Sequence, residues 1–324
     1  MAEAVIMEMF LPAAAEGASA PRNGDGPLFH QAWWLEAAAG PALERVQVIW
    51  DGQVVGSRAF VRRRNFLFRL LNMPPYTHTQ GPVLHLPESK PAKAMRNRHR
   101  VVKELIAQLP VHDRFHLFLD PDDSSSFSFA LAGCSIMQDF TFRLNKDCDL
   151  ALHWENLDQK TRNLIRSAEK KLEVRHGSDL ESFIGMCVKE RGKENTHILE
   201  AMRRVGNAAL EHRQATVLTA NDERGRAVAS AVLVWDDAVL YYWQSSRDPE
   251  NAVPGANNLL VWEAIRFALR HGRTFDLDGY ASEGAARFGA KFGMEPVVRA
   301  SVAHMSLMGH FSRALTGTRN HFQE

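Results

Sequence analysis

The sequence has little cysteine and no long apolar run. Its three cysteines, Cys134, Cys148 and Cys187, are widely spaced and form no Cys-x-x-Cys pair. They therefore indicate neither a disulfide framework nor a zinc site. No stretch approaches the roughly 18 to 20 apolar residues that a membrane-crossing helix needs. The histidines are scattered and show no His-Glu-x-x-His pattern, which argues against metal catalysis. We expect a cytoplasmic protein with no metal site and no membrane span.

An excess of either charge is also lacking. The chain has 39 Lys and Arg against 38 Asp and Glu, for a formal net charge of +1. This balance provides no overall attraction to nucleic acid or to a membrane surface, so DNA is not an expected partner and any basic site must be local. With 324 residues, of which 45% are hydrophobic, the chain is long enough for two domains, each with its own core.

The two ends of the chain are expected to be tails. Residues 1–26 contain Glu3, Glu8 and Glu16 in place of a basic leader, and their apolar runs are short, so we predict a flexible N-terminal tail. Residues 306–324 are predicted to form a C-terminal tail.

Between the tails, a similar order of elements occurs twice. Residues 27–148 read as a helix, three strands, a helix, a strand, a short helix and a strand. Residues 149–305 read as helices, three strands joined by tight turns, a helix, a strand, a short helix and a strand. We therefore predict two domains of the same kind, 27–148 and 149–305.

A helix with a basic face is predicted near the join, over residues 153–174. Arg162, Arg166 and Lys170 follow one another at a spacing of four residues, which places them on one face. Such a face is either an ordinary solvated surface or an anion-binding stripe.

The stretch "RTFDLDGYASEGAARFGAKFGMEP", residues 273–296, combines acids with a packed helix. Residues 274–278 alternate apolar and acidic, which predicts a strand that stops at Gly279. In the helix that follows, Phe288, Gly289 and Phe292 share one face, and the glycine is expected to allow close packing.

Asp276 and Asp278 are expected to share one face at the end of that strand. Paired carboxylates beside a cleft raise one another's pKa, which would let one of them accept a proton from an amine. The structural alternative is that they cap a helix or pair with Arg270 and Arg273. The candidate catalytic residues are Asp278, Asp276, Tyr280 and Glu283.

A second candidate site is the loop that opens the helix before Leu259. Unpaired amide groups and the positive end of the helix dipole would meet there, which suits a phosphate or pyrophosphate. The alternative is that Asn257 or Asn258 only caps the helix. The candidate cofactor-binding residues, which would hold such a phosphate, are Gly255, Ala256, Asn257 and Asn258. On the preceding strand, Tyr242 and Gln244 are expected to share one face and Trp243 the other.

Taken in order, these segments resemble the GNAT acyltransferase fold, and the two-copy arrangement is similar to the FemAB/FemX group of peptide-bridge aminoacyltransferases. The resemblance is carried by "NLDQKTRNLIRSAEKKLEV", "YYWQSS", "FDLDG" and "RFGAKFG". It implies an α/β (α+β) fold of tandem GNAT-like domains, each with a mixed, mostly antiparallel twisted sheet flanked by helices. It also implies acyl transfer to a primary amine, with an amine or peptide acceptor.

Two departures from the family pattern bear on the site. The lysine of the bridge-forming group's Phe-Lys-x-x-Phe-Gly motif is replaced by Gly289, and Lys291 lies two residues further on. The coenzyme A loop is degenerate in "AVPGAN". The candidate substrate-binding residues are Arg162, Arg166, Arg191, Tyr242, Gln244 and Lys291.

Three functions remain open. The first is an N-acyltransferase that uses an acyl-CoA type thioester as co-substrate, without a tightly bound cofactor. The second is an aminoacyl-tRNA-dependent enzyme of the FemX type, in which tRNA would bind the basic clusters at residues 62–64 and 96–100. The third is a binding protein that has kept the fold and lost catalysis.

Overall fold

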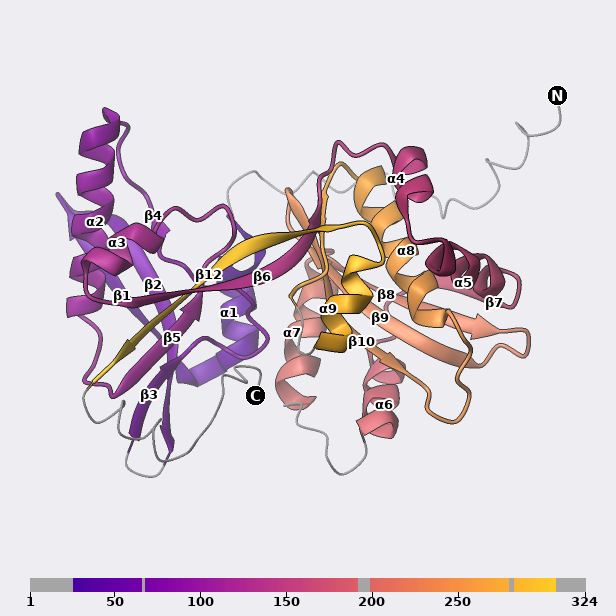
Figure 1. Ribbon diagram of the computed structural model, residues 1–324. Helices are drawn as coiled ribbons and strands as arrows, with labels where there is room; N and C mark the ends of the chain where they lie inside the picture. Colours follow the sequence, from indigo (N-terminus) through magenta and orange to yellow (C-terminus); the bar gives the residue numbers. More distant parts are fainter. Residues whose placement is uncertain (1–25, 66–67, 192–198, 280–282, 307–324) are drawn as a thin grey trace, which may run out of the picture.

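One continuous twisted sheet runs through the whole molecule (Figure 1). The computed structural model describes residues 26–65, 68–191, 199–279 and 283–306. Within them, the strand order is β1-β2-β3-β5-β12-β6-β11-β10-β9-β8-β7, and the short β4 pairs with β2. Most neighbouring strands pair antiparallel, while β3 with β5 and β10 with β11 pair parallel. The predicted mixed, mostly antiparallel α/β class is confirmed.

The first half contributes one end of this sheet and the helices on it. Its elements are η1 (Leu28–His30), α1 (Ala32–Ala39), η2 (Gly40–Ala42), β1 (Leu43–Trp50), β2 (Gln53–Asn65), β3 (Phe68–Asn72), β4 (Val83–Leu84), α2 (Pro91–Ala107), β5 (Arg114–Phe118), α3 (Ser126–Leu131) and β6 (Ser135–Leu144).

The second half contributes the other end. Its elements are α4 (Leu150–Asn156), α5 (Gln159–Glu169), β7 (Leu172–Gly177), α6 (Leu180–Arg191), α7 (Leu199–Glu211), β8 (Ala215–Asp222), β9 (Ala227–Trp235), β10 (Val239–Arg247), α8 (Ala256–Arg270), β11 (Thr274–Asp276), α9 (Glu283–Ala290) and β12 (Glu295–Met305).

Two long strands join the halves at the centre of the molecule (Figure 1). The last strand, β12, inserts between β5 and β6 of the first half and pairs antiparallel with both. In turn, β6 pairs with β11 of the second half. The halves are thus connected by exchanged strands as well as by the covalent chain. The division at residues 148 and 149 stays a prediction, because the sheet itself is not divided there.

The predicted helix over residues 153–174 is wrong in its extent. The structure has α4, then a break at Leu157, then α5, and the last part is the strand β7. The break arises because the Asp158 side chain accepts a hydrogen bond from the Thr161 backbone N–H at 3.0 Å and so starts a new helix. Beyond Lys170, residues 172–177 pair with β8 instead of continuing the helix.

Separate apolar clusters cover the two faces of the second half of the sheet. On one face, Tyr242 and Phe275 pack under α5 and α8. On the other face, Tyr241 and Trp243 pack with α6 and α7 and also with Phe29 of the first half. The second face is therefore partly covered by η1 and α1, which brings the start of the first half against the second half.

The close packing predicted for Gly289 is present. A β-carbon at this position would lie 2.9 Å from side-chain carbons of both Leu277 and Phe142, closer than ordinary van der Waals contact. The glycine thus allows α9 to lie directly on the ends of β11 and β6, on the face of the sheet that α8 covers.

We expect Gly289→Ala to lower the free energy of unfolding by about 1 to 3 kcal/mol, because the added methyl group must displace α9. The matched control is Gly185→Ala in α6, where a β-carbon would meet no atom within 4 Å. That change is expected to stabilise the protein by up to about 1 kcal/mol through helix propensity. Urea unfolding of both variants measures the difference, and equal effects would show that α9 does not need the close approach.

Candidate functional site

Strands β10 and β11 start side by side and then separate. They pair in parallel over three residue pairs, the last of which is Tyr241 with Asp276. Strand β10 continues to Arg247, whereas β11 ends at Asp276. Beyond Tyr241, the edge of β10 that faced β11 has no strand partner among the described residues. This divergence leaves backbone N–H and C=O groups free to bind an extended ligand.

A β-bulge lies in β10 at the point of divergence. Tyr242 pairs with Leu233 of β9, and Gln244 pairs with the very next residue, Val232, so Trp243 is the extra residue. A β-bulge changes the direction in which side chains point, and such bulges are common next to functional sites. The prediction that Tyr242 and Gln244 share a face is wrong, because one extra residue reverses the alternation. Gln244 points to the face of Tyr241 and Trp243, while Tyr242 points to the opposite, α8-covered face.

The loop after β10 ends at the N-terminus of α8. Gly255 is the N-cap residue, with φ of 87°, and no side chain caps the first turn. The alternative that Asn257 or Asn258 caps the helix is thus not what the structure has. The Asn257 Oδ1 atom is buried without a hydrogen-bond partner among the described residues. The Ala256 N–H donates to the backbone oxygen of Val253 at 3.1 Å, so the first turn of α8 keeps the amide groups of Asn257 and Asn258 for an anion.

Gly255 also has a packing role. A β-carbon there would lie 2.5 Å from the backbone oxygen of Leu164 in α5. The glycine is needed both for its left-handed conformation and for the contact of α5 with the start of α8. The strands and the helix end that we predicted to form a donor site are thus adjacent. The assignment of donor binding to residues 255–258 stays a prediction.

Asp276 is buried in a network of hydrogen bonds on the Tyr241 face. Its Oδ2 accepts from Arg143 Nε at 2.7 Å, and its Oδ1 accepts from the Thr141 hydroxyl. Oδ1 also accepts from the backbone N–H of Asp278 at 2.7 Å. Burial raises the pKa of Asp276, and the charge and hydrogen bonds of Arg143, with the Thr141 hydrogen bond, oppose that shift. With both oxygens engaged, Asp276 is suited to hold the backbone of the site.

Asp278 lies beyond the end of β11, not within the strand as predicted. It has φ of 67°, the left-handed conformation that asparagine and aspartate tolerate better than most residues. Its side chain is 5% exposed and contacts the His78 ring at Nδ1. The second carboxylate oxygen lies 3.6 Å from Arg299 Nη1. Asp278 is thus the acid that links the end of β11 to the first half of the chain.

Neither Asp276 nor Asp278 pairs with Arg270 or Arg273, which were the predicted structural partners. Arg273 Nε donates to the backbone oxygen of Asp236 at 2.7 Å, and Arg270 Nε donates to the backbone oxygen of Arg266. Both acids instead take partners from distant segments: Arg143 from β6, Arg299 from β12 and His78 from the loop before β4. The two arginines arrive through the exchange of β6 and β12, and His78 arrives on the loop before β4.

The other predicted catalytic residues do not join this network in the described part of the chain. Glu283 is the first residue of α9, is exposed and pairs with Arg287 at 2.5 Å. Tyr280 lies outside the described residues. Arg191 is the last residue of α6, and its side chain is not described. Its neighbour Glu190 accepts from the Ser246 hydroxyl at 2.7 Å, so the end of α6 lies beside the end of β10.

The basic candidates gather around the start of α5, on the α8 side of the sheet. Arg162 Nη1 donates to the backbone oxygen of Glu155 at 2.6 Å, and the Arg166 guanidinium lies 5.4 Å from the centre of the Trp154 ring. Lys291 is exposed, and its backbone oxygen accepts from the N–H of Asp158 at 3.4 Å. Arg162 is therefore occupied by the end of α4, whereas Arg166 and Lys291 keep exposed positions.

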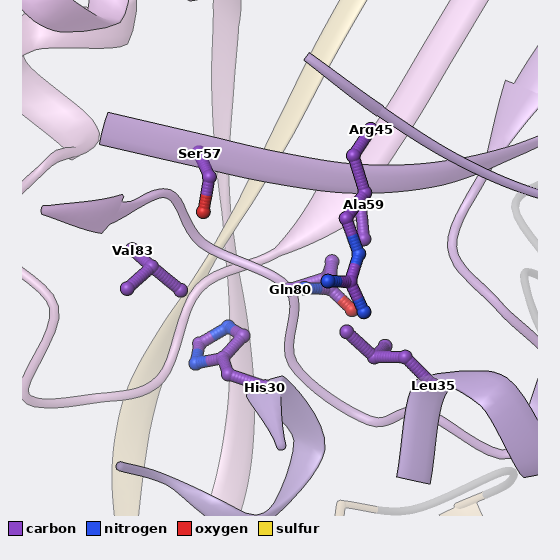
Figure 2. A pocket seen from close by; sticks show the side chains of 7 residues that line it. All are labelled: His30, Leu35, Arg45, Ser57, Ala59, Gln80 and Val83. Atoms are coloured by element: carbon purple, nitrogen blue, oxygen red, sulfur yellow. The ribbon is translucent and has the colours of Figure 1, made fainter. Parts of the chain in front are cut away.

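Two surface hollows are separate from the diverging strands. One of about 40 Å³ lies in the first half, where the Arg45 side chain approaches Gln80 and His30 faces Val83 (Figure 2). It has room for only a few water molecules, so it is too small for a nucleotide or a pantetheine arm. The other, of about 360 Å³, lies between the start of β7 and the end of β8, at the edge of the sheet farthest from the exchanged strands.

Sequence reasoning did not find His78, Arg143 and Arg299. None of them lies near the candidate acids in the chain, and none belongs to a recognisable motif. His78 follows a proline-rich turn, "PPYTHT", which reads as an ordinary loop. Arg143 and Arg299 each interrupt an apolar strand pattern, and a buried charge at such a position was the available signal.

The described residues contain no helix able to cross a membrane and no group of three or more metal-ligating side chains.

Comparisons with known proteins bear on the family and on the fold. Residues 159–288 match the family model of the acetyltransferase (GNAT) domain. No curated protein matches the sequence. The solved structure of FemX resembles this chain over 91% of its length and 95% of FemX, with a TM-score of 0.66 and 14% identity. L-PGS from Bacillus licheniformis is similar over 88% of this chain and 92% of its own, with a TM-score of 0.55 and 10% identity.

A conserved protein of unknown function from Bacteroides thetaiotaomicron is similar over 85% of this chain and 90% of its own, with a TM-score of 0.55 and 12% identity. At these identities the likenesses establish the fold and leave the substrates open. Residues 159–288 thus match a GNAT acetyltransferase domain, which supports a transferase, and the chain has the fold of FemX over most of its length.

Proposed function

We propose that the protein is an N-acyltransferase that moves an acyl group from an acyl-CoA type thioester to a primary amine by direct attack. The observation that carries the proposal is the divergence of β10 from β11 directly before the uncapped N-terminus of α8. The acids at the end of β11 lie on the opposite face of the sheet from α8. A donor held by its phosphates at α8 would pass its thioester between the strands toward those acids.

Backbone groups at the N-terminus of α8 favour binding of the acyl donor's phosphates there. The amide groups of residues 257 and 258 and the dipole of a helix of 15 residues together attract a pyrophosphate. The unpaired edge of β10 beyond Tyr241 can bind the amide groups of a pantetheine arm as a strand would. Exposed Arg166 lies on the same side of the sheet and adds positive charge. These features fit a compact thioester donor.

Polar groups on the Tyr241 face of the sheet favour binding of the amine acceptor there. Gln244 is turned to this face by the bulge, and Asp278 lies there at the end of β11. The amine nitrogen would attack the thioester carbon from this side. The C–S bond breaks with the electron pair going to the thiolate, while the amine proton passes to a base at the site.

An aminoacyl-tRNA donor is the second candidate, because the likeness to FemX covers nearly all of both chains. Such a donor requires a broad surface of free basic side chains. Of the predicted tRNA-binding arginines, Arg62 pairs with Glu44 at 2.7 Å and Arg100 pairs with Glu104 at 2.8 Å. Because these charges are partly neutralised, we favour the thioester.

The proposal is tested by thermal unfolding with acetyl-CoA and, separately, with charged tRNA, followed by mass spectrometry of amine acceptors. A ligand that binds only the folded state raises the melting temperature by mass action. We expect a shift with acetyl-CoA, none with charged tRNA, and acetyl transfer to at least one of an alkylamine, an amino acid, an amino sugar or a peptide. A shift with tRNA alone would favour the second donor, and no shift with either would overturn the proposal.

Asn258→Asp tests the position of the donor. An added carboxylate in the first turn of α8 stabilises the helix by a few tenths of a kcal/mol to about 1 kcal/mol, yet repels a pyrophosphate. We therefore expect a small rise in the melting temperature of the free protein and at least a tenfold loss of acetyl-CoA affinity, about 1.4 kcal/mol. Unchanged affinity would place the donor elsewhere.

A further inference from the structure

The contact between His78 and Asp278 has the form of an oriented base. Asp278 is on the segment after β11, and His78 is on the loop before β4, 200 residues earlier in the chain. Burial, with the nearby charge of Arg299, lowers the pKa of His78 to about 3, which keeps the resting ring neutral near pH 7. A neutral ring can approach the Asp278 carboxylate at Nδ1 only with its hydrogen on that nitrogen, because an unprotonated Nδ1 would repel the carboxylate. A neutral ring that donates at Nδ1 carries its free lone pair at Nε2. A ring with so low a pKa accepts a proton only if the adjacent Asp278 carboxylate stabilises the imidazolium that forms.

The His78 side chain is not fully buried. The side chain of His78 is 14% exposed, and among the described residues no hydrogen bond ties Nε2 to a neighbour. Several other buried histidines have partners or closed surroundings; for example, His116 Nε2 lies 2.7 Å from the Ser301 hydroxyl. His78 thus combines a neutral ring, a carboxylate on one nitrogen and an accessible second nitrogen.

The position of His78 coincides with the point where β10 and β11 separate. Phe29 stacks on the His78 ring at 5.0 Å with an interplanar angle of 6°, and the same Phe29 lies 4.7 Å from the ring of Tyr241. Tyr241 and Asp276 form the last pair between the two strands. On the β10 side, Trp243 Nε1 donates to the backbone oxygen of Tyr76 at 3.2 Å. The loop that carries His78 therefore lies along the bulge of β10 and reaches across to Asp278.

The surroundings hold the ring in one orientation. Phe29 fixes its plane, and Asp278 fixes which nitrogen carries the proton. Asp278 is itself held by its left-handed backbone, by the hydrogen bond from its N–H to Asp276 and by Arg299. This arrangement of a base oriented by a buried carboxylate is the logic of hydrolytic and acyl-transfer triads.

We propose that His78 is the general base of the transfer reaction and that Asp278 positions it. This inference rests on the proposed function and names the residue that performs its proton transfer. As the amine nitrogen forms its bond to the thioester carbon, His78 Nε2 takes the proton that the nitrogen loses. The C–S bond breaks with its electron pair going to the thiolate, and the proton then passes from Nε2 to that thiolate or to water. The first half of the chain thus supplies the base, and the second half holds the donor.

The test compares His78→Gln with His212→Gln. The control histidine also connects the two halves, because its ring stacks on Trp33 at 4.4 Å, but it is exposed and follows α7, whereas both acids lie at the end of β11. For each variant, the melting temperature, the acetyl-CoA affinity and the rate of acetyl transfer to an amine accepted by the wild type are measured. We expect His78→Gln to lower kcat by roughly 10² to 10⁴ with acetyl-CoA affinity within about threefold of wild type. His212→Gln is expected to leave all three close to wild type.

A second measurement serves if His78→Gln does not fold. Diethyl pyrocarbonate acylates neutral imidazole nitrogens, so treatment of the wild-type protein is expected to modify His78 and to remove transfer in proportion to that modification, as located by mass spectrometry. Retained transfer in fully modified protein, or in folded His78→Gln, would overturn the role of His78 and leave the proposed function standing. Absence of any transfer by the untreated wild type would overturn the proposed function itself, and this inference with it.

Discussion

Asp278→Asn is expected to lower kcat by about three orders of magnitude while acetyl-CoA affinity changes by less than about threefold. Asparagine tolerates the left-handed backbone at this position, so the fold of the segment is kept. The amide has no negative charge and presents a donor as well as an acceptor. It can therefore hold His78 in the wrong tautomer, with the lone pair turned away from the acceptor amine.

The matched control for this prediction is Asp139→Asn. Asp139 Oδ2 lies 3.6 Å from Arg299 Nη2, the same distance at which Asp278 approaches that guanidinium. Both variants remove a carboxylate from Arg299, but only Asp278 contacts His78. Steady-state kinetics should separate them, with the control within about threefold of wild type. Equal turnover for Asp278→Asn and wild type would remove Asp278 from the site.

Arg143→Met is expected to lower the free energy of unfolding by about 3 to 5 kcal/mol near neutral pH, the cost of leaving a buried charge without its partner. The Arg143 side chain is 9% exposed and binds Asp276 at 2.7 Å and Asp120 at 2.7 Å. Methionine fills similar space without charge, so both carboxylates lose their cation. Urea unfolding at equilibrium measures the loss.

The pH dependence of that loss has a defined sign. Without Arg143, burial raises the pKa of Asp276 in the folded protein above its value in the unfolded chain. A group of this kind stabilises the fold at low pH and loses that contribution as the pH rises. The difference from wild type should therefore be larger at about pH 8 than at about pH 5. The control is Arg62→Met, whose partner Glu44 is on the surface, and its effect should stay below about 1 kcal/mol. Equal losses in the two variants would show that the Arg143 network adds nothing beyond a surface pair.

Much of the local structure could be read from the chain. The apolar runs and tight turns of residues 215–246 predicted the three strands β8, β9 and β10, and the Phe-Gly spacing of residues 288–293 predicted a helix packed through a glycine. These features depend on neighbours in sequence, where periodicity and turn residues act directly. Boundaries were less accurate, because the N-cap at Asp158 and the early end of β11 depend on side-chain hydrogen bonds that periodicity does not show.

The bulge in β10 is a feature that the sequence did not predict. The chain shows an unbroken run, "YYWQSS", with no glycine at residue 243. The register shift comes from pairing with β9 and from the Trp243 hydrogen bond to Tyr76. One extra residue turned Gln244 to the opposite face, and so changed which of the predicted binding residues lie together.

By itself, the sequence determined the alternation of strands and helices, the balance of charge, the acids at 276 and 278 and the glycine that opens α8. All of these follow from local propensity and from spacing along the chain. Only the tertiary structure decided what the acids contact. The exchange of β6 and β12 brings Arg143 and Arg299 to the second half of the sheet, and the loop before β4 brings His78 to Asp278. The contacts of Asp276 with Arg143 and of Asp278 with His78 join residues 133 and 200 positions apart, where no periodic pattern in the sequence carries information about the pairing.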